Sequence, residues 1–202
     1  MVMATQATRG KGLDRRAVVA RLMRGRNGLL VVTGLGSPAY DVHAAGDDDG
    51  TFYLWGAMGG AALMGLGLAQ ARPDRSVVVV TGDGEQMMGL GGLATIGVAA
   101  PRNLVVIVLD NQHFGETGMQ RSHTGFGVDL AAIAVSSGFA EGRTVADEAG
   151  VEELVSAMET PASGPRLYVI KVRAENVPRS LPARDAVYLK NRVRAHLGLG
   201  VN

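Results

Sequence analysis

The chain has 202 residues and a formal net charge of +1, and it contains no cysteine. This length suits one α/β domain with a sizeable core, and the near-neutral charge gives no reason to expect nucleic-acid binding. The absence of cysteine excludes disulfides, cysteine-ligated zinc and iron–sulfur clusters within this chain.

The N-terminal residues 1–12 are polar and lack the apolar core of a secretory signal. We therefore expect a disordered tail, followed by a single domain over 13–202. The longest stretch of small apolar residues, 57–69, is interrupted by glycines and is too short to span a bilayer. These features predict a cytoplasmic protein without a membrane segment.

Strand-like and helix-like segments alternate along the rest of the chain. A helix is expected over 13–24 with Asp14 as its N-cap, and a buried helix over 57–72 is stopped by Pro73. Further helices are predicted over 85–99, 129–137, 151–159 and 182–197, strands over 28–33, 76–81, 104–109, 139–144 and 166–172, a polar turn at 47–50 and a loop at 114–126. The alternation predicts an α/β fold, namely a doubly wound, mostly parallel sheet with helices on both faces.

Two polar residues stand where very apolar strands end. The strand at 76–81 runs into Gly82-Asp83-Gly84, and the strand at 104–109 runs into Asp110-Asn111. Ligands bind beyond the carboxyl ends of parallel strands, so a carboxylate and an amide oxygen should converge there. Such oxygens suit Mg²⁺. Gly-Asp-Gly alone is also common in tight turns, and the second strand ending in Asn favours the metal site.

The spacing of these residues resembles a known signature. Gly82-Asp83-Gly84-Glu85, followed by Asn111 28 residues after the aspartate, resembles the motif of thiamine diphosphate enzymes. The resemblance implies thiamine diphosphate and Mg²⁺ as cofactors. It also implies that the Asp83 and Asn111 side chains and the His113 carbonyl hold the metal, with the diphosphate filling most of the remaining octahedron.

The same resemblance assigns roles to two turns upstream. Met58 would wedge under the cofactor, and the Gly56 carbonyl would accept a hydrogen bond from the aminopyrimidine; alternatively, Met58 is a core methionine. Thr33-Gly34 and Ser37 follow the first strand, where bare backbone N–H groups opening a helix form an anion site. The family uses this turn for the diphosphate, and an ordinary strand-to-helix turn is the alternative.

A third stretch extends past the metal motif. Asp110-Asn111 followed by Thr117-Gly118 looks like the decarboxylases of phosphonopyruvate and sulfopyruvate, and so does Gly56-Ala57-Met58-Gly59, although Ala57 stands where this branch usually has Ser. The resemblance implies catalytic roles for Gly56, Met58, His113 and Thr117, and cofactor contacts from Thr33, Gly34, Ser37, Gly56, Met58, Gly82, Asp83, Gly84, Glu85, Asn111, His113, Phe114 and Gly115.

Three histidines are expected near this end of the sheet. His113, His43 and His123 could move protons near neutral pH. Alternatively, His113 acts only through its carbonyl, and His43 and His123 are surface residues.

Thiamine diphosphate enzymes also need a domain that binds the pyrimidine ring, and only the diphosphate-binding half is recognisable here. The resemblance therefore implies a split 2-oxo acid decarboxylase. This chain would be the β-type subunit of a hetero-oligomer, an α-type subunit would supply the other half, and the substrate would be a small anionic 2-oxo acid. The glycine-rich helix 57–72 is a candidate interface.

Other functions remain open at this point. A carboligase or synthase built on the same halves and a non-catalytic cofactor-binding regulatory module are the alternatives. A subunit of a ferredoxin-linked 2-oxo acid oxidoreductase is disfavoured, because cysteines bind its iron–sulfur clusters and this chain has none.

Overall fold

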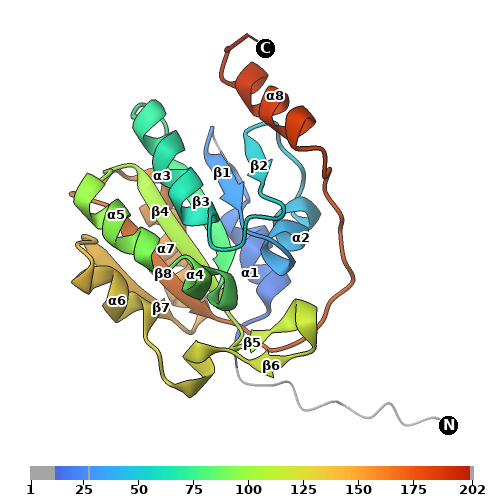
Figure 1. The fold of residues 1–202 in the computed structure, drawn as a ribbon, viewed down its shortest axis with the longest axis vertical. Coiled ribbons are helices and arrows are strands. Elements are labelled where there is room, and N and C mark those ends of the chain that lie inside the picture. Colours follow the sequence, from blue (N-terminus) through green and yellow to red (C-terminus); the bar gives the residue numbers. More distant parts are fainter. Residues whose placement is uncertain (1–11, 27, 201–202) are drawn as a thin grey trace, which may run out of the picture.

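The structure is a computed structural model that describes residues 12–26 and 28–200, so the tail predicted at 1–12 lies outside the described residues except for Gly12. A six-stranded parallel sheet in the order β2-β1-β3-β4-β8-β7 forms the centre of the fold (Figure 1). A small antiparallel pair, β5-β6, follows β4. The strands are β1 (Leu30–Thr33), β2 (Thr51–Tyr53), β3 (Val77–Gly82), β4 (Leu104–Asp110), β5 (His113–Phe114), β6 (Gln120–Arg121), β7 (Glu141–Val145) and β8 (Arg166–Lys171).

Helices cover both faces of the sheet, which confirms the predicted doubly wound α/β fold (Figure 1). One core cluster takes side chains from α1 (Arg15–Leu22), α2 (Ser37–Ala44), α7 (Glu148–Glu159) and α8 (Ala186–His196). The opposite cluster takes side chains from α3 (Ala61–Ala71), α5 (Gly91–Ala99) and α6 (Leu130–Ser136). The short helix α4 (Asp83–Met88) follows β3 directly, and two 3₁₀ turns, η1 (Gly115–Thr117) and η2 (His123–Phe126), lie in the loop after β4.

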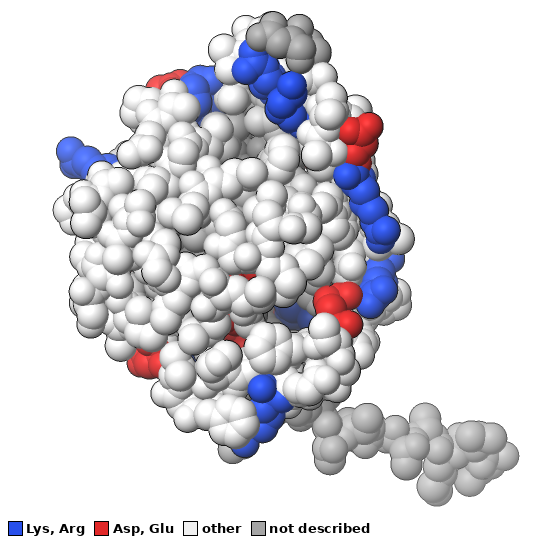
Figure 2. Space-filling model, in the orientation of Figure 1, with Lys and Arg blue, Asp and Glu red and all other residues white. Residues whose placement is uncertain are grey.

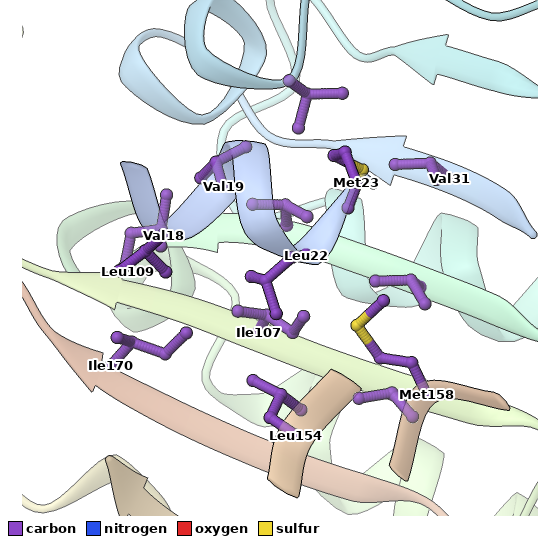
Figure 3. Close-up of a cluster of buried hydrophobic side chains, with 14 of the residues drawn as sticks. Val18, Val19, Leu22, Met23, Val31, Ile107, Leu109, Leu154, Met158 and Ile170 are labelled. Atoms are coloured by element: carbon purple, nitrogen blue, oxygen red, sulfur yellow. The ribbon is translucent and has the colours of Figure 1, made fainter. Parts of the chain in front are cut away.

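The valine-rich strands are apolar throughout because both of their faces are buried. In β3, Val78 and Val80 belong to the first cluster, and Val77 and Val79 belong to the second. Figure 3 shows the first cluster, in which helices α1 and α7 pack their apolar side chains onto β4 and β8. Each large aliphatic side chain buried in this way contributes about 1.5–3 kcal/mol.

Four helices begin at an aspartate whose side chain accepts a backbone N–H from the first turn. The predicted N-cap Asp14 accepts from the Ala17 N–H at 3.0 Å, which confirms that prediction. Asp129, Asp147 and Asp185 cap α6, α7 and α8 in the same way. Such caps each stabilise a helix by about 1 kcal/mol.

Two predictions of local structure were wrong, and two elements were missed. The helix expected over 57–72 begins only at Ala61, because the glycine-bearing segment before it forms a turn, and it is not fully buried, since Leu63 and Met64 are 40% and 36% exposed. The helix expected over 85–99 is two helices, α4 and α5, separated at Gly89 and Leu90. Helix α2 and strand β2 were not predicted. Among the described residues, no helix has the length and apolarity needed to cross a bilayer.

The winding of the chain reverses between β1 and β3. From β1 the chain moves outward to β2, and it then returns to place β3 on the other side of β1. The connections that leave the carboxyl ends of these two strands therefore diverge, and the crevice between them is the usual ligand site in such sheets. Thr33 ends β1 and Gly82 ends β3, so the residues that follow both strands border this crevice.

Candidate functional site

A cavity of about 180 Å³ opens at the carboxyl ends of β1, β3 and β4. Eleven of the residues predicted for the site line it, namely Ser37, Met58, Gly82, Asp83, Gly84, Glu85, Asn111, His113, Phe114, Gly115 and Thr117. Three others, Thr33, Gly34 and Gly56, do not line it. The fold therefore brings together segments that are far apart in the sequence, at the crevice where the topology predicts a ligand.

Asp83 occupies the first position of α4, immediately after β3. Asp83 is only 2% exposed, although it lines the cavity. The glycine that follows is required by packing: a Cβ on Gly84 would lie 2.4 Å from the Phe114 ring. Glycine at this position lets Phe114 lie directly over the turn that carries Asp83.

A buried polar network holds one carboxylate oxygen of Asp83. Ser122 donates to Asp83 Oδ2, and Thr124 Oγ1 lies 2.9 Å from the same oxygen. Thr124 Oγ1 also lies 2.7 Å from Asp110 Oδ1, and Lys171 forms an ion pair with Asp110 Oδ2. With Oδ2 engaged in this way, Oδ1 is the oxygen left for a ligand. Burial raises the pKa of Asp83, the hydrogen bond from Ser122 lowers it, and the nearby Asp110 charge raises it further.

Asn111 and His113 are oriented by contacts with each other. The His113 backbone N–H donates to Asn111 Oδ1 at 2.9 Å, which fixes the position of the amide. His113 Nδ1 lies 2.8 Å from the Asn111 carbonyl oxygen. Because a carbonyl only accepts, Nδ1 is the donor in this contact.

The donor set at this end of the sheet contains few charged ligands. Among the described residues, no three His, Cys, Asp or Glu side chains are grouped to hold a metal. Asp83 and Asn111 offer one carboxylate and one amide oxygen to the same cavity. This chemistry fits Mg²⁺, which keeps several waters or phosphate oxygens and takes only one or two carboxylates from protein, and it does not fit a metal held by protein side chains alone.

Buried polar atoms without a hydrogen-bond partner occur on β1 and α4, the elements on either side of the crevice. Glu85 is 7% exposed; its Oε2 accepts from Thr81 Oγ1 at 2.7 Å, and a Cβ on Gly34 would lie 1.6 Å from that oxygen. Glu85 Oε1, Thr33 Oγ1 and Gln86 Nε2 have no hydrogen-bond partner among the described residues. Burial raises the pKa of Glu85, and the Thr81 hydrogen bond opposes that effect. Buried polar atoms are nearly always satisfied, so water or another polar group is expected beside these atoms; of their residues, only Glu85 lines the cavity.

Met58 lies in the turn before α3 and borders the cavity. It is 46% exposed, so the alternative of a core methionine is wrong. Gly56, two residues earlier, adopts a φ of 72°, a left-handed conformation that favours glycine. The turn therefore presents Met58 at the mouth of the cavity instead of packing it into the protein.

The histidines and Thr117 differ in their relation to the cavity. His43 does not line it; its Nδ1 lies 2.8 Å from Ser180 Oγ, and its ring packs edge-on against Tyr53. His123 is exposed, does not line it, and packs edge-on against the Phe114 ring. Thr117 lines the cavity from the exposed η1 turn.

Sequence reasoning missed several residues of the site. Five unpredicted residues also line the cavity, namely Arg15, Leu35, Pro38, Leu109 and Glu116. Leu35 falls within the turn already predicted to bind an anion, and Pro38 directly follows that turn. No sequence signal marked Arg15, or the hydroxyls of Ser122 and Thr124 that hold Asp83, because their roles depend on tertiary contacts.

Comparison with known proteins identifies the class that this fold and site define. The sequence from 43 to 172 matches the family described as thiamine pyrophosphate enzyme, C-terminal TPP binding domain. The chain belongs to this family.

Individual relatives are consistent with the family. The chain is 38% identical over 190 residues to phosphonopyruvate decarboxylase of Streptomyces viridochromogenes, covering 91% of this chain and 45% of that protein. It is 38% identical over 149 residues to sulfopyruvate decarboxylase subunit beta of Methanothermobacter thermautotrophicus, covering 74% of this chain and 78% of that subunit. The chain thus spans less than half of the length of the Streptomyces enzyme.

Solved structures share the fold. The benzoylformate decarboxylase of Polynucleobacter necessarius superposes with a TM-score of 0.69 at 18% identity, covering 88% of this chain and 36% of that one. At this identity the likeness supports the fold alone.

Proposed function

We propose that this chain is the diphosphate-binding, β-type subunit of a two-chain thiamine diphosphate-dependent decarboxylase of small anionic 2-oxo acids. The observation that carries the proposal is the convergence of Asp83 and Asn111 on one cavity at the switch point of the sheet. The similarity to phosphonopyruvate decarboxylase and to a sulfopyruvate decarboxylase β subunit supports the substrate class and the subunit type.

The residues of the cavity suit the metal and the cofactor. Asp83 Oδ1 and the Asn111 amide oxygen would hold Mg²⁺ together with the His113 carbonyl. The turn after β1, which includes Ser37, and the start of α4 would bind the diphosphate with backbone N–H groups.

Thiamine diphosphate, when bound, supplies an electron sink for the loss of CO₂ from a 2-oxo acid. The contribution of this chain is to bind and orient. Met58 is exposed at the mouth of the cavity, where its side chain would contact the bound cofactor. The Nδ1 of His113 donates to the Asn111 carbonyl, so Nε2 is the ring nitrogen that remains to exchange a proton in the cavity.

An uncharged apolar surface supports the proposed partner chain. Residues 55–71 and 86–101 contain no charged side chain, and Figure 2 shows almost no charge over α3, α4 and α5. Large apolar side chains are exposed on this surface, namely Met58, Leu63, Met64, Met88 and Val98. We call this the uncharged face. Exposed apolar patches mark interaction sites, and Met58 belongs both to this face and to the cavity, so a partner bound here would complete the site.

A reconstitution experiment tests the proposal. The purified chain, assayed with thiamine diphosphate, Mg²⁺ and sulfopyruvate or phosphonopyruvate, should be inactive alone and should gain activity with its α-type partner. Robust turnover by the chain alone would refute the split-enzyme proposal. Cofactor binding by the reconstituted complex without release of CO₂ would favour the regulatory module, and a coupled product in place of the aldehyde would favour a carboligase.

A matched pair of variants tests the uncharged face. Met88 on α4 and Val187 on α8 are 61% and 63% exposed, so a charge is tolerated by the fold at either position. Met88→Asp should weaken association with the partner by at least about tenfold, because it buries a charge in the interface, and Val187→Asp should not. Equal affinities for both variants in calorimetry would exclude this face as the interface.

A further inference from the structure

Arg15 is a buried cation that borders the cavity and has no role so far. It is the first residue of α1 and is only 4% exposed, yet it lines the cavity beside Ser37 and Pro38 of α2. Apart from His113, it is the only basic residue among those that line the cavity. A buried arginine at a ligand cavity therefore calls for a physical explanation, since charged residues are almost never fully buried unless paired.

The partners of Arg15 fix its guanidinium but do not use all of it. Its Nε donates to Asp41, which is fully buried, and its Nη1 lies 3.4 Å from the Glu175 carbonyl oxygen. Its Nη2 makes no hydrogen bond to any described residue, and it is not among the buried atoms that lack a partner. One terminal nitrogen of a rigidly held guanidinium is therefore left accessible.

The ion-pair cluster around Arg15 carries an excess positive charge. Asp41 is shared with a second arginine, Arg16, whose Nε and Nη2 lie 3.0 and 2.9 Å from Asp41 Oδ1. One carboxylate thus neutralises only one of two guanidinium groups. Arg16 has a further hydrogen-bond partner, because its Nη2 also donates to the Pro178 carbonyl at 2.8 Å. Its side chain is 31% exposed to solvent, and it does not line the cavity. Of the two guanidinium groups that share Asp41, only that of Arg15 lines the cavity.

The other ionised residues that line the cavity are carboxylates. Asp83, Glu85 and Glu116 line it with carboxylates, and Glu116 is paired at its outer side with Arg179 at 2.9 Å. An anionic ligand would be repelled by such a lining unless a fixed cation lay beside it. Guanidinium groups with free N–H donors suit tetrahedral oxyanions in particular, because they offer directed, charge-assisted hydrogen bonds.

We propose that Arg15 is an anion-binding residue of this cavity and donates from Nη2 to a phosphate, phosphonate or sulfonate oxygen of the ligand. The inference rests on the proposed function for the identity of the ligand. The oxyanion comes either from the diphosphate of the cofactor or from the second acid group of the substrate, and the chemistry of recognition is the same for both.

The test compares Arg15→Gln with Arg16→Gln. Both variants remove one ion pair to Asp41, but only the first changes the cavity. Binding of inorganic pyrophosphate with Mg²⁺ to the full chain, and of thiamine diphosphate to the reconstituted complex, is measured by calorimetry. In that complex, KM is measured for sulfopyruvate and for pyruvate, which lacks a second acid group. Thermal melts of both variants monitor folding, and Arg15→Lys provides a variant that keeps a cation beside Asp41.

Two results support the proposal, and they distinguish the cofactor diphosphate from the second acid group of the substrate as the bound anion. If the anion is the diphosphate, Arg15→Gln weakens pyrophosphate and cofactor binding by about tenfold or more. If it belongs to the substrate, the variant raises KM for sulfopyruvate by a similar factor and leaves KM for pyruvate unchanged. Arg15→Lys should recover part of either loss.

Other results overturn it. Unchanged binding and KM in Arg15→Gln, or equal losses in Arg15→Gln and Arg16→Gln, would mean that Arg15 serves only to neutralise Asp41. Failure of the proposed function looks different, because the wild-type complex itself would then bind no thiamine diphosphate or release no CO₂.

Discussion

Replacing Thr124 with valine tests whether the network around Asp83 positions it for a metal. Valine has nearly the same shape as threonine, so the change removes a hydroxyl with little change in packing. The lost oxygen lies 2.9 Å from Asp83 Oδ2 and 2.7 Å from Asp110 Oδ1. Because a hydroxyl has a single proton, it donates to one of these carboxylates at a time, and the variant leaves both with one fewer polar neighbour.

The magnitude follows from the burial of this network. Thr124, Asp83 and Asp110 are 4%, 2% and 1% exposed, so water cannot replace the hydroxyl. A hydrogen bond to a charged group contributes about 1.5–3 kcal/mol, which for a domain of this size corresponds to a melting temperature lower by about 3–12 °C. Ser122 still donates to Asp83, so we expect the carboxylate to be mobile but not displaced. Loss of such outer contacts lowers metal affinity by about 10- to 100-fold.

The assay is a calorimetric titration of Mg²⁺ in the presence of thiamine diphosphate, which gives the metal affinity. Thermal melts recorded by circular dichroism give the melting temperature. Thr124→Ser keeps the hydroxyl and is the matched control; it should retain the wild-type metal affinity. Thr117→Val changes an exposed threonine of the same cavity and should not alter the melting temperature. Unchanged Mg²⁺ affinity in Thr124→Val, or equal losses in the valine and serine variants, would refute the positioning role.

Three further predictions concern the same site. Asp83→Ala and Asn111→Ala should each abolish Mg²⁺-dependent cofactor binding with the fold retained, which calorimetry and circular dichroism check; unchanged affinity would refute the metal assignment. Met58→Ala should change the free energy of unfolding by less than about 0.5 kcal/mol, because the side chain is 46% exposed, while lowering the rate of the reconstituted complex; a large drop in melting temperature with an unchanged rate would exclude the wedge role. Gly34→Ala should destabilise the chain by about 1–3 kcal/mol, because its Cβ displaces Glu85 from Thr81, and Glu85→Ala should relieve most of that loss in a double-mutant cycle.

The sequence predicted the sheet well because its strands are buried on both faces. The valine run at 77–80 and the aliphatic run at 104–109 have few alternatives in an α/β chain. Asp83 and Asn111 directly follow the strands that contain these runs. Helix α2 and strand β2 escaped prediction since each is short and lacks a clear period. Strand β2 has only three residues, and it is a strand because β1 offers it a partner.

The exposed side of α3 also could not be predicted. Its sequence has no charged residue between Ala61 and Ala71, so its apolar pattern is the same on every side and contains no signal that distinguishes a buried face from an exposed one. The structure buries Ala62 and Leu66 and leaves Leu63 and Met64 exposed. A half-exposed helix whose only polar side chain is Gln70 is the pattern expected when a second chain covers it.

The residues that support the site were the hardest to predict, because they act through contacts between distant segments. Thr124 reaches Asp83 from 41 residues away, and Arg15 reaches Asp41 from 26. Both sit beside groups that the sequence did mark, yet a lone threonine in a loop and a lone arginine at a helix start have no pattern of their own. Only the folded chain relates them to the cavity.

The distribution of charge constrains how a partner could complete this site. Met58 belongs both to the uncharged face and to the lining of the cavity, which also includes Asp83 and Arg15. A chain that covered the uncharged face would exclude water from the mouth of the cavity. Asp83 and Arg15 each keep a hydrogen-bond partner within this chain, which lowers the cost of excluding that water. Electrostatic interactions strengthen when water is excluded. Ligand affinity and partner affinity should therefore be coupled, with each measured in calorimetry as tighter when the other component is present. Independent affinities would mean that the partner leaves the mouth of the cavity open.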